Sequence, residues 1–161
     1  MENAPTFQML LERMPARIAH YRIVHSMQAA REKPLALIVE DQLFSRTILH
    51  EMLRHDYRVD MAASAQEGLY LFLENAPDLV FLDIELMDES GHSLARALRA
   101  IDPKVFITMV TANHSPEDIA QAKANGVDGF IAKPYSKQKI GESLAAFKAS
   151  HDTPTTQGRS S

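Results

Sequence analysis

The chain has 161 residues, 45% hydrophobic and 24% charged, as expected for a globular protein with one domain-sized core. The formal net charge of −4 argues against direct nucleic-acid binding, which favours a basic surface, and the lack of cysteine excludes disulfides and thiolate metal sites. No apolar run approaches the ~20 residues that span a bilayer, and the first residues do not resemble a signal peptide. We therefore expect a cytoplasmic protein.

Residues 1–33 differ from the rest of the chain and predict a helical extension. They hold five basic and three acidic side chains, whereas acids outnumber bases in the remainder. Apolar residues recur at helical spacing on either side of Pro15, which suits the start of a second helix. Ile23 and Met27 widen the apolar face of that second helix. Such a face needs a partner, and three remain open: the domain that follows, a second copy of the chain, or another protein.

From Pro34 onward, short apolar strands alternate with amphipathic helices five times. The strands are predicted over residues 35–39, 57–61, 79–83, 105–110 and 129–132, and the helices over 42–54, 64–75, 94–101, 115–125 and 136–149. This alternation with short links is typical of an α/β fold, in which a parallel sheet is covered by helices on both faces. Because the strand at 57–61 alternates between apolar and polar residues, we expect it at an edge of the sheet.

Local signals add detail to this prediction. Ser64 and Glu67 have the spacing of a capping box, which starts a helix. In the helix over 42–54, helical spacing relates the residues Leu43, Phe44, Thr47, Ile48 and Met52. Residues 150–161 are polar and are expected to be disordered. The chain is thus divided into a helical extension (1–33), one α/β domain (34–149) and a polar tail (150–161).

Reactive side chains follow four of the predicted strands: Glu40 and Asp41, then Asp83, Thr111 and Lys133. Parallel strands end at one edge of their sheet, where open α/β folds bind ligands. Three carboxylates near one another repel unless a cation lies among them, and an all-oxygen ligand set favours Mg²⁺. An aspartate can act as a nucleophile towards phosphorus, and a lysine and a hydroxyl suit a phosphoryl group. These residues predict Mg²⁺-dependent phosphorylation of Asp83.

At these strand ends the chain resembles the receiver domain of two-component response regulators, over about residues 34–149. Four segments carry the resemblance: Ile38-Val39-Glu40-Asp41, Leu82-Asp83-Ile84, Met109-Val110-Thr111-Ala112 and the run from Gly126 to Pro134. All four occur in order, and each closes a predicted strand. The resemblance implies a fold like that of the chemotaxis regulators, a five-stranded parallel sheet in the order 2-1-3-4-5 with helices on both faces.

The resemblance also implies roles for the acidic residues. Asp83 would accept a phosphoryl group from a phosphohistidine on a sensor histidine kinase or a histidine phosphotransfer protein. Asp41 would ligate Mg²⁺ directly and Glu40 through water, Asp83 would belong to the same metal site, and Glu85 would offer its backbone carbonyl. The chain would then be a phosphoacceptor that catalyses its own phosphorylation and dephosphorylation, and not an enzyme that turns over a small substrate.

The remaining roles implied by the resemblance concern the signal. Thr111 and Lys133 would contact the phosphoryl oxygens, and Thr111 would shift together with the aromatic ring of Phe130. This switch would alter the surface formed by the last two helices and the strand between them, which would contact a downstream protein target or a second copy of the chain. Residues 1–33 are the other candidate for a homodimer contact.

The loop after Asp83 departs from the family pattern. Met87 and Ser90 stand where the family usually has a proline and an aspartate, so the rigidity of this loop does not follow from the resemblance. Glu85 and Asn113 occupy the positions that flank the bound phosphate in the family and tune its lifetime.

Three hypotheses use the same site residues. The chain is a stand-alone response regulator, an intermediate phosphorelay carrier that passes its phosphoryl group to a phosphotransfer histidine, or the receiver fragment of a longer regulator. The sequence names neither the kinase nor the target.

Overall fold

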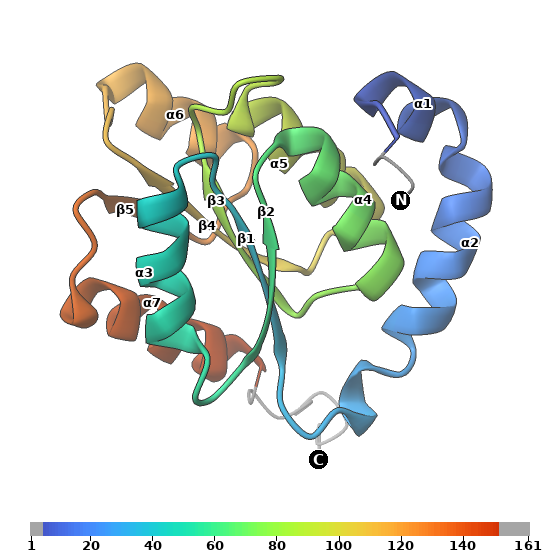
Figure 1. The fold of residues 1–161 in the computed structure, drawn as a ribbon, viewed down its shortest axis with the longest axis horizontal. Helices are drawn as coiled ribbons and strands as arrows, with labels where there is room; N and C mark the ends of the chain where they lie inside the picture. Colours follow the sequence, from blue (N-terminus) through green and yellow to red (C-terminus); the bar gives the residue numbers. More distant parts are fainter. Residues whose placement is uncertain (1–4, 152–161) are drawn as a thin grey trace, which may run out of the picture.

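The structure is a computed structural model and describes residues 5–151. Its centre is a five-stranded parallel sheet with the strand order β2-β1-β3-β4-β5, as the sequence predicted (Figure 1). The strands are β1 (Leu35–Val39), β2 (Arg58–Ala62), β3 (Leu79–Asp83), β4 (Phe106–Thr111) and β5 (Gly129–Ala132).

Seven α-helices surround the sheet in the described part of the chain. They are α1 (Phe7–Glu12), α2 (Met14–His25), α3 (Leu43–Leu53), α4 (Ala65–Asn75), α5 (Gly91–Ile101), α6 (Pro116–Ala124) and α7 (Lys137–His151). Helices α3 and α7 cover one face of the sheet, whereas α4, α5 and α6 cover the other (Figure 1). Within residues 5–151, no helix has the length and apolar character to cross a membrane. Most of the predicted polar tail lies outside the described residues.

Both faces of the central strands are buried, which explains why β1 and β3 are apolar without interruption. Leu37 and Val39 of β1 belong to the core cluster under α4 and α5, whereas the alternate residue Ile38 belongs to the cluster under α3 and α7. Successive side chains of a strand point to opposite faces, so residues 36–39 of β1 and 79–82 of β3 enter the two clusters alternately. The sheet edge at which the strands end is thereby held by packing from both sides.

Helix α3 forms where predicted, and the structure shows which side of it is buried. Leu43 and Phe44 are 68% and 77% exposed, and the residues that α3 buries in the core are Leu49 and Leu53. Helical spacing therefore located this helix but did not identify its buried face.

The N-terminal helices pack on their own domain, along α4 (Figure 1). Leu10 of α1 is completely buried, and the ring of Tyr21 in α2 stacks on Phe72 of α4 with 5.1 Å between ring centroids. The residues predicted to widen this apolar face, Ile23 and Met27, are not covered by the domain, because both remain more than 60% exposed. The extension therefore contributes to the core through a narrower stripe than the sequence indicated.

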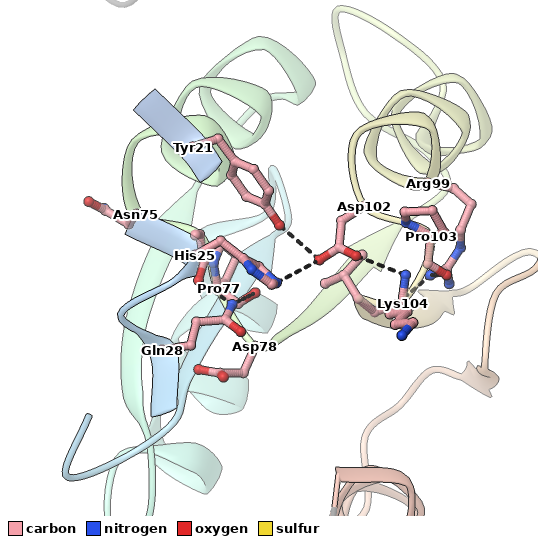
Figure 2. A network of polar contacts seen from close by, with 12 residues as sticks. Tyr21, His25, Gln28, Asn75, Pro77, Asp78, Arg99, Asp102, Pro103 and Lys104 are labelled. Atoms are coloured by element: carbon pink, nitrogen blue, oxygen red, sulfur yellow. Dashed lines mark hydrogen bonds and ion pairs between the residues drawn. The ribbon is translucent and has the colours of Figure 1, made fainter. Parts of the chain in front are cut away.

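A polar contact completes this packing. The Tyr21 hydroxyl donates a hydrogen bond of 2.8 Å to Asp102 at the end of α5, and Figure 2 shows Tyr21 and His25 both pointing toward that carboxylate. Burial and the adjacent Asp102 carboxylate raise the pKa of Tyr21, so its hydroxyl stays protonated and remains a donor. The contact joins α2 to the helix that follows the phosphoacceptor candidate.

Neighbouring leucines of α1 test whether the extension is part of the folded core. Leu10→Ala should lower the free energy of unfolding by about 2–5 kcal/mol, since it removes a completely buried side chain. Leu11→Ala removes a side chain that is 42% exposed and should cost less than about 1 kcal/mol. Urea unfolding followed by circular dichroism measures both. Equal, small effects of the two substitutions would show that α1 does not dock in solution.

Candidate functional site

The site is built around Lys133, which directly follows β5. Its ammonium nitrogen lies 2.9 Å from Asp83 Oδ2 and also pairs with Glu40 Oε1. Glu40 follows β1 and is completely buried, and Asp83 ends β3 with only 4% exposure. The three predicted residues thus come from three strands and meet at one edge of the sheet.

Charge is not balanced within this group. Burial and the neighbouring Asp83 raise the pKa of Glu40 to about 8, although Lys133 acts in the opposite direction. Burial tends to lower the pKa of Lys133, but its hydrogen bonds to Glu40 and Asp83 outweigh burial and raise that pKa. Lys133 therefore stays an ammonium, and the carboxylates around it carry more negative charge than it can neutralise.

The predicted metal ligands Glu40, Asp41 and Asp83 come together. Carboxylate oxygens from the three residues lie within 4.8 Å of one another. Glu40 Oε2 is buried and has no hydrogen-bond partner among the described residues. A buried carboxylate oxygen without a partner is costly unless a cation or water satisfies it. The donor set contains only oxygen, so these residues fit Mg²⁺.

A cavity of about 260 Å³ opens beside the three carboxylates. Its lining includes Asp41, Asp83, Glu85, Met87 and Lys133. The cavity gives the Asp83 carboxylate access from the surface, although the residue itself is almost completely buried. The cavity therefore offers a small molecule or ion a route to the Asp83 carboxylate.

Two helix caps hold the loop after Asp83. Both oxygens of the Asp88 carboxylate accept backbone hydrogen bonds of 2.9 Å, from the amides of Ala65 and Gln66 in the first turn of α4. Ser90 Oγ accepts a hydrogen bond of 3.0 Å from the His92 amide and caps α5. Side-chain oxygens in these positions satisfy amides that a helix start leaves unpaired. The loop is thus anchored at two points without the family's usual proline.

Backbone contacts fix the part of this loop nearest to Asp83. The Glu85 amide donates to Asp83 Oδ1 at 3.0 Å, and the Gly91 amide donates to the Ile84 carbonyl at 2.8 Å. A Cβ atom on Gly91 would lie only 2.1 Å from the Asp83 carbonyl oxygen. Glycine is required at position 91 because no side chain fits between the loop and β3.

The predicted signalling residues lie beside the carboxylates. Thr111 ends β4, is completely buried, and accepts a hydrogen bond of 3.2 Å from the Asn113 amide. The Asn113 side chain donates to the Glu85 carboxylate, so the two residues predicted to tune phosphate lifetime contact each other. Phe130 is half-buried and packs against the core cluster on the α4–α5 face.

Sequence reasoning missed Asp88 and two further residues near the site. Arg46 in the first turns of α3 donates to the backbone carbonyls of Glu40 at 2.7 Å and Asp41 at 3.3 Å, which fixes the loop that carries both acids. The ring of Tyr135 lies beside the Lys133 ammonium, 6.0 Å from nitrogen to ring centroid. The closeness of Arg46 to the acid pair in sequence was a usable signal, whereas the contact of Asp88 with α4 spans more than twenty residues and leaves none.

Comparison with known proteins identifies relatives with this arrangement. Residues 36–145 match the response regulator receiver domain family. The chain is 35% identical over 112 residues to the sensory transduction protein LytR of Staphylococcus saprophyticus, covering 68% of this chain and 43% of that protein. It is 29% identical over 110 residues to the chemotaxis protein CheY of Halobacterium salinarum, covering 68% of this chain and 92% of that protein. The chain thus spans less than half of LytR and nearly all of CheY.

Solved structures show the same fold. A CheY-like receiver domain protein from Methanospirillum hungatei superposes with a TM-score of 0.72 at 26% identity, covering 76% of this chain and 99% of that one. The receiver domain of HemR from Leptospira biflexa gives a TM-score of 0.67 at 31% identity, covering 71% of this chain and 94% of that one. The family match begins at residue 36 and leaves α1 and α2 outside it.

Two glycines provide a test of the loop geometry. Gly91→Ala should destabilise the protein by about 3 kcal/mol, because the new methyl group meets backbone atoms of Asp83 that cannot move aside. Gly141→Ala in α7 should stabilise the protein by about 0.5–1 kcal/mol, since no atom lies within 4 Å of the position that its methyl group would take and alanine favours a helix. Thermal and urea unfolding measure both, and a neutral Gly91→Ala would contradict this loop geometry.

The raised pKa of Glu40 predicts a pH dependence of stability. Between its ordinary value of 4.5 and about 8, folded metal-free protein holds a proton that the unfolded chain has released, so stability falls as pH rises through this window. Glu40→Gln cannot ionise and should remove that fall, with a gain of the order of 1 kcal/mol at neutral pH. Urea unfolding at several pH values across this window, with a chelator present, measures the free energy of unfolding of both proteins. Parallel wild-type and variant curves of that free energy against pH would refute the prediction.

Proposed function

The chain belongs to the response regulator receiver domain family, and on this premise we propose that Asp83 is its phosphoacceptor in a two-component pathway. The observation that carries the proposal is the group of buried carboxylates around Lys133, with one oxygen of Glu40 left unpaired. A purely structural ion pair has no need of a third carboxylate or of an open cavity beside it. Reversible phosphorylation uses all of these features.

In the proposed reaction, a carboxylate oxygen of Asp83 attacks the phosphorus of a phosphohistidine on a sensor kinase or phosphotransfer protein. A P–O bond forms, the P–N bond breaks, and its electron pair stays on the imidazole nitrogen. The Lys133 ammonium, now paired with Asp83 Oδ2, is close enough to exchange that contact for one with a phosphoryl oxygen. The reaction therefore keeps one positive charge next to the group being transferred.

Metal binding is assigned to the same edge of the sheet. The Glu40 and Asp41 side chains, Asp83 and the Glu85 backbone carbonyl would hold Mg²⁺. When bound, the ion would neutralise the excess negative charge and draw electron density from the phosphoryl oxygens. The unpaired oxygen of Glu40 and the spacing of the three carboxylates support this assignment.

Signal output is proposed to begin at Thr111. Its hydroxyl oxygen now accepts from the Asn113 amide, and it would donate to the phosphoryl group once Asp83 is modified. The movement of Thr111 would let Phe130 pack more deeply and change the surface of α6, β5 and α7, which would contact a downstream protein. Glu85 lines the cavity and contacts Asn113, and these two side chains would control how readily water hydrolyses the acyl phosphate.

Mass spectrometry tests the proposal directly. Acetyl phosphate with Mg²⁺ should add one phosphoryl group to the wild-type chain, and chelation of the metal should prevent the addition. Asp83→Asn should remove the modification completely because the amide is not a nucleophile, whereas Asp56→Asn, at an exposed position outside the site, should leave it unchanged. A wild-type chain that stays unmodified under these conditions would refute phosphorylation of Asp83.

A further inference from the structure

The segment after α2, residues 28–31, forms hydrogen bonds with the carboxyl-terminal end of α4. The Arg31 guanidinium donates to backbone carbonyls at residues 75 and 76 and pairs with the Asp78 carboxylate at 3.0 Å. The Gln28 side chain donates to the carbonyls of residues 76 and 77, at 2.8 and 3.2 Å; Figure 2 shows Gln28 beside Pro77. Carbonyls at the end of a helix have no partners inside the helix, so the N-terminal segment supplies them.

These contacts are buried and therefore well defined. The Arg31 side chain is 13% exposed and that of Asp78 only 4%. Asp78 also accepts a hydrogen bond of 2.7 Å from the Leu35 amide, so one carboxylate joins the N-terminal segment to the start of β1. Further along α2, Tyr21 stacks on Phe72 of α4. The extension thus holds α4 both at its end and along its side.

The opposite end of α4 contacts the phosphoacceptor loop. Asp88 accepts hydrogen bonds from the Ala65 and Gln66 amides, which belong to the first turn of α4. Between the two ends, Gly68 lies so close to β1 that a Cβ atom there would be 2.8 Å from a methyl group of Val39. Helix α4 is eleven residues long and is therefore in contact with the extension at one end and with the loop at the other.

From these contacts we infer that the N-terminal helices set the conformation of the loop after Asp83, and that they act through α4 and the positioning residue Asp88. A helix transmits a displacement along its axis as a nearly rigid body, so a shift at its carboxyl end moves the amides that bind Asp88. The effect of this coupling on phosphorylation rests on the proposed function, because the loop provides the Glu85 amide and carbonyl beside Asp83.

The composition of the loop after Asp83 makes Asp88 important for the loop's position. Met87 takes the place of the usual proline and is 88% exposed, so it adds neither backbone stiffness nor buried contact. Leu86 packs against the core cluster and Glu85 contacts Asn113, whereas the Asp88 cap ties the loop to α4 in the described residues. Through this cap, the loop is linked to the position of α4.

Amide hydrogen exchange tests the coupling without phosphate or metal. Arg31→Met should weaken the hold on α4 and speed exchange at Ala65, Gln66 and Gly91 by roughly tenfold. Asp88→Ala should have the same effect, and Asp88→Asn, which keeps one acceptor oxygen, should restore part of the protection. The matched controls are Arg22→Met, on the exposed side of α2, and Glu89→Ala, next to Asp88; no hydrogen bond or ion pair joins either side chain to α4 in the described structure.

Phosphorylation by acetyl phosphate supplies the second readout, in the full chain. Arg31→Met alone should slow phosphorylation roughly tenfold, because residues that support a metal site affect its activity by about this factor. In a chain that already carries Asp88→Ala, the same substitution should have little further effect. Gln28→Met is the milder substitution for use if Arg31→Met does not fold.

Two results would overturn the inference. One is unchanged exchange of the loop amides in Arg31→Met and in Gln28→Met, which would show that the extension supports stability only. The other is full additivity of the Arg31 and Asp88 effects on phosphorylation, which would show that they act independently. If the wild-type chain takes no phosphate, the proposed function fails, yet the exchange measurement still decides whether the extension and the loop are coupled.

Discussion

A buried ammonium holds together the carboxyl edge of the sheet. Lys133 lies between Glu40 and Asp83, two carboxylates from different strands that would otherwise repel each other at close range. One ammonium cannot neutralise these two acids and Asp41 as well, and burial together with the neighbouring Asp83 raises the pKa of Glu40. The same imbalance destabilises the metal-free fold and favours a divalent cation, so the property that weakens the metal-free protein is the one that the proposed chemistry would use.

The rest of the site keeps this group in place through contacts to the backbone. Arg46 binds the carbonyls behind the acid pair, Gly91 allows the loop to lie against β3, and Asp88 and Ser90 cap the helices that the loop approaches. A cap fixes the orientation of a side chain as well as stabilising the helix, because a carboxylate that accepts hydrogen bonds from two amides is held in one orientation. In this chain, caps replace the stiffness that a proline gives the loop in most members of the family.

The N-terminal helices extend this support beyond the matched family region. They lie on α4 and not on the face formed by α6, β5 and α7, so that face stays free of the extension in the described residues. Their outward side carries Ile23 and Met27, both strongly exposed. The receiver fold and its extension therefore share one core while leaving the proposed output surface uncovered.

The sequence by itself determined the order of the elements and which side chains gather at the carboxyl edge of the sheet, since Glu40, Asp83 and Lys133 each stand at the end of an apolar strand and parallel strands end at one edge. Only the tertiary structure decided that Asp88 caps α4 and which side of α3 faces water. Both depend on how distant elements pack against one another: a helical period shows that Phe44 lies on an apolar stripe, but not that this side chain is left exposed.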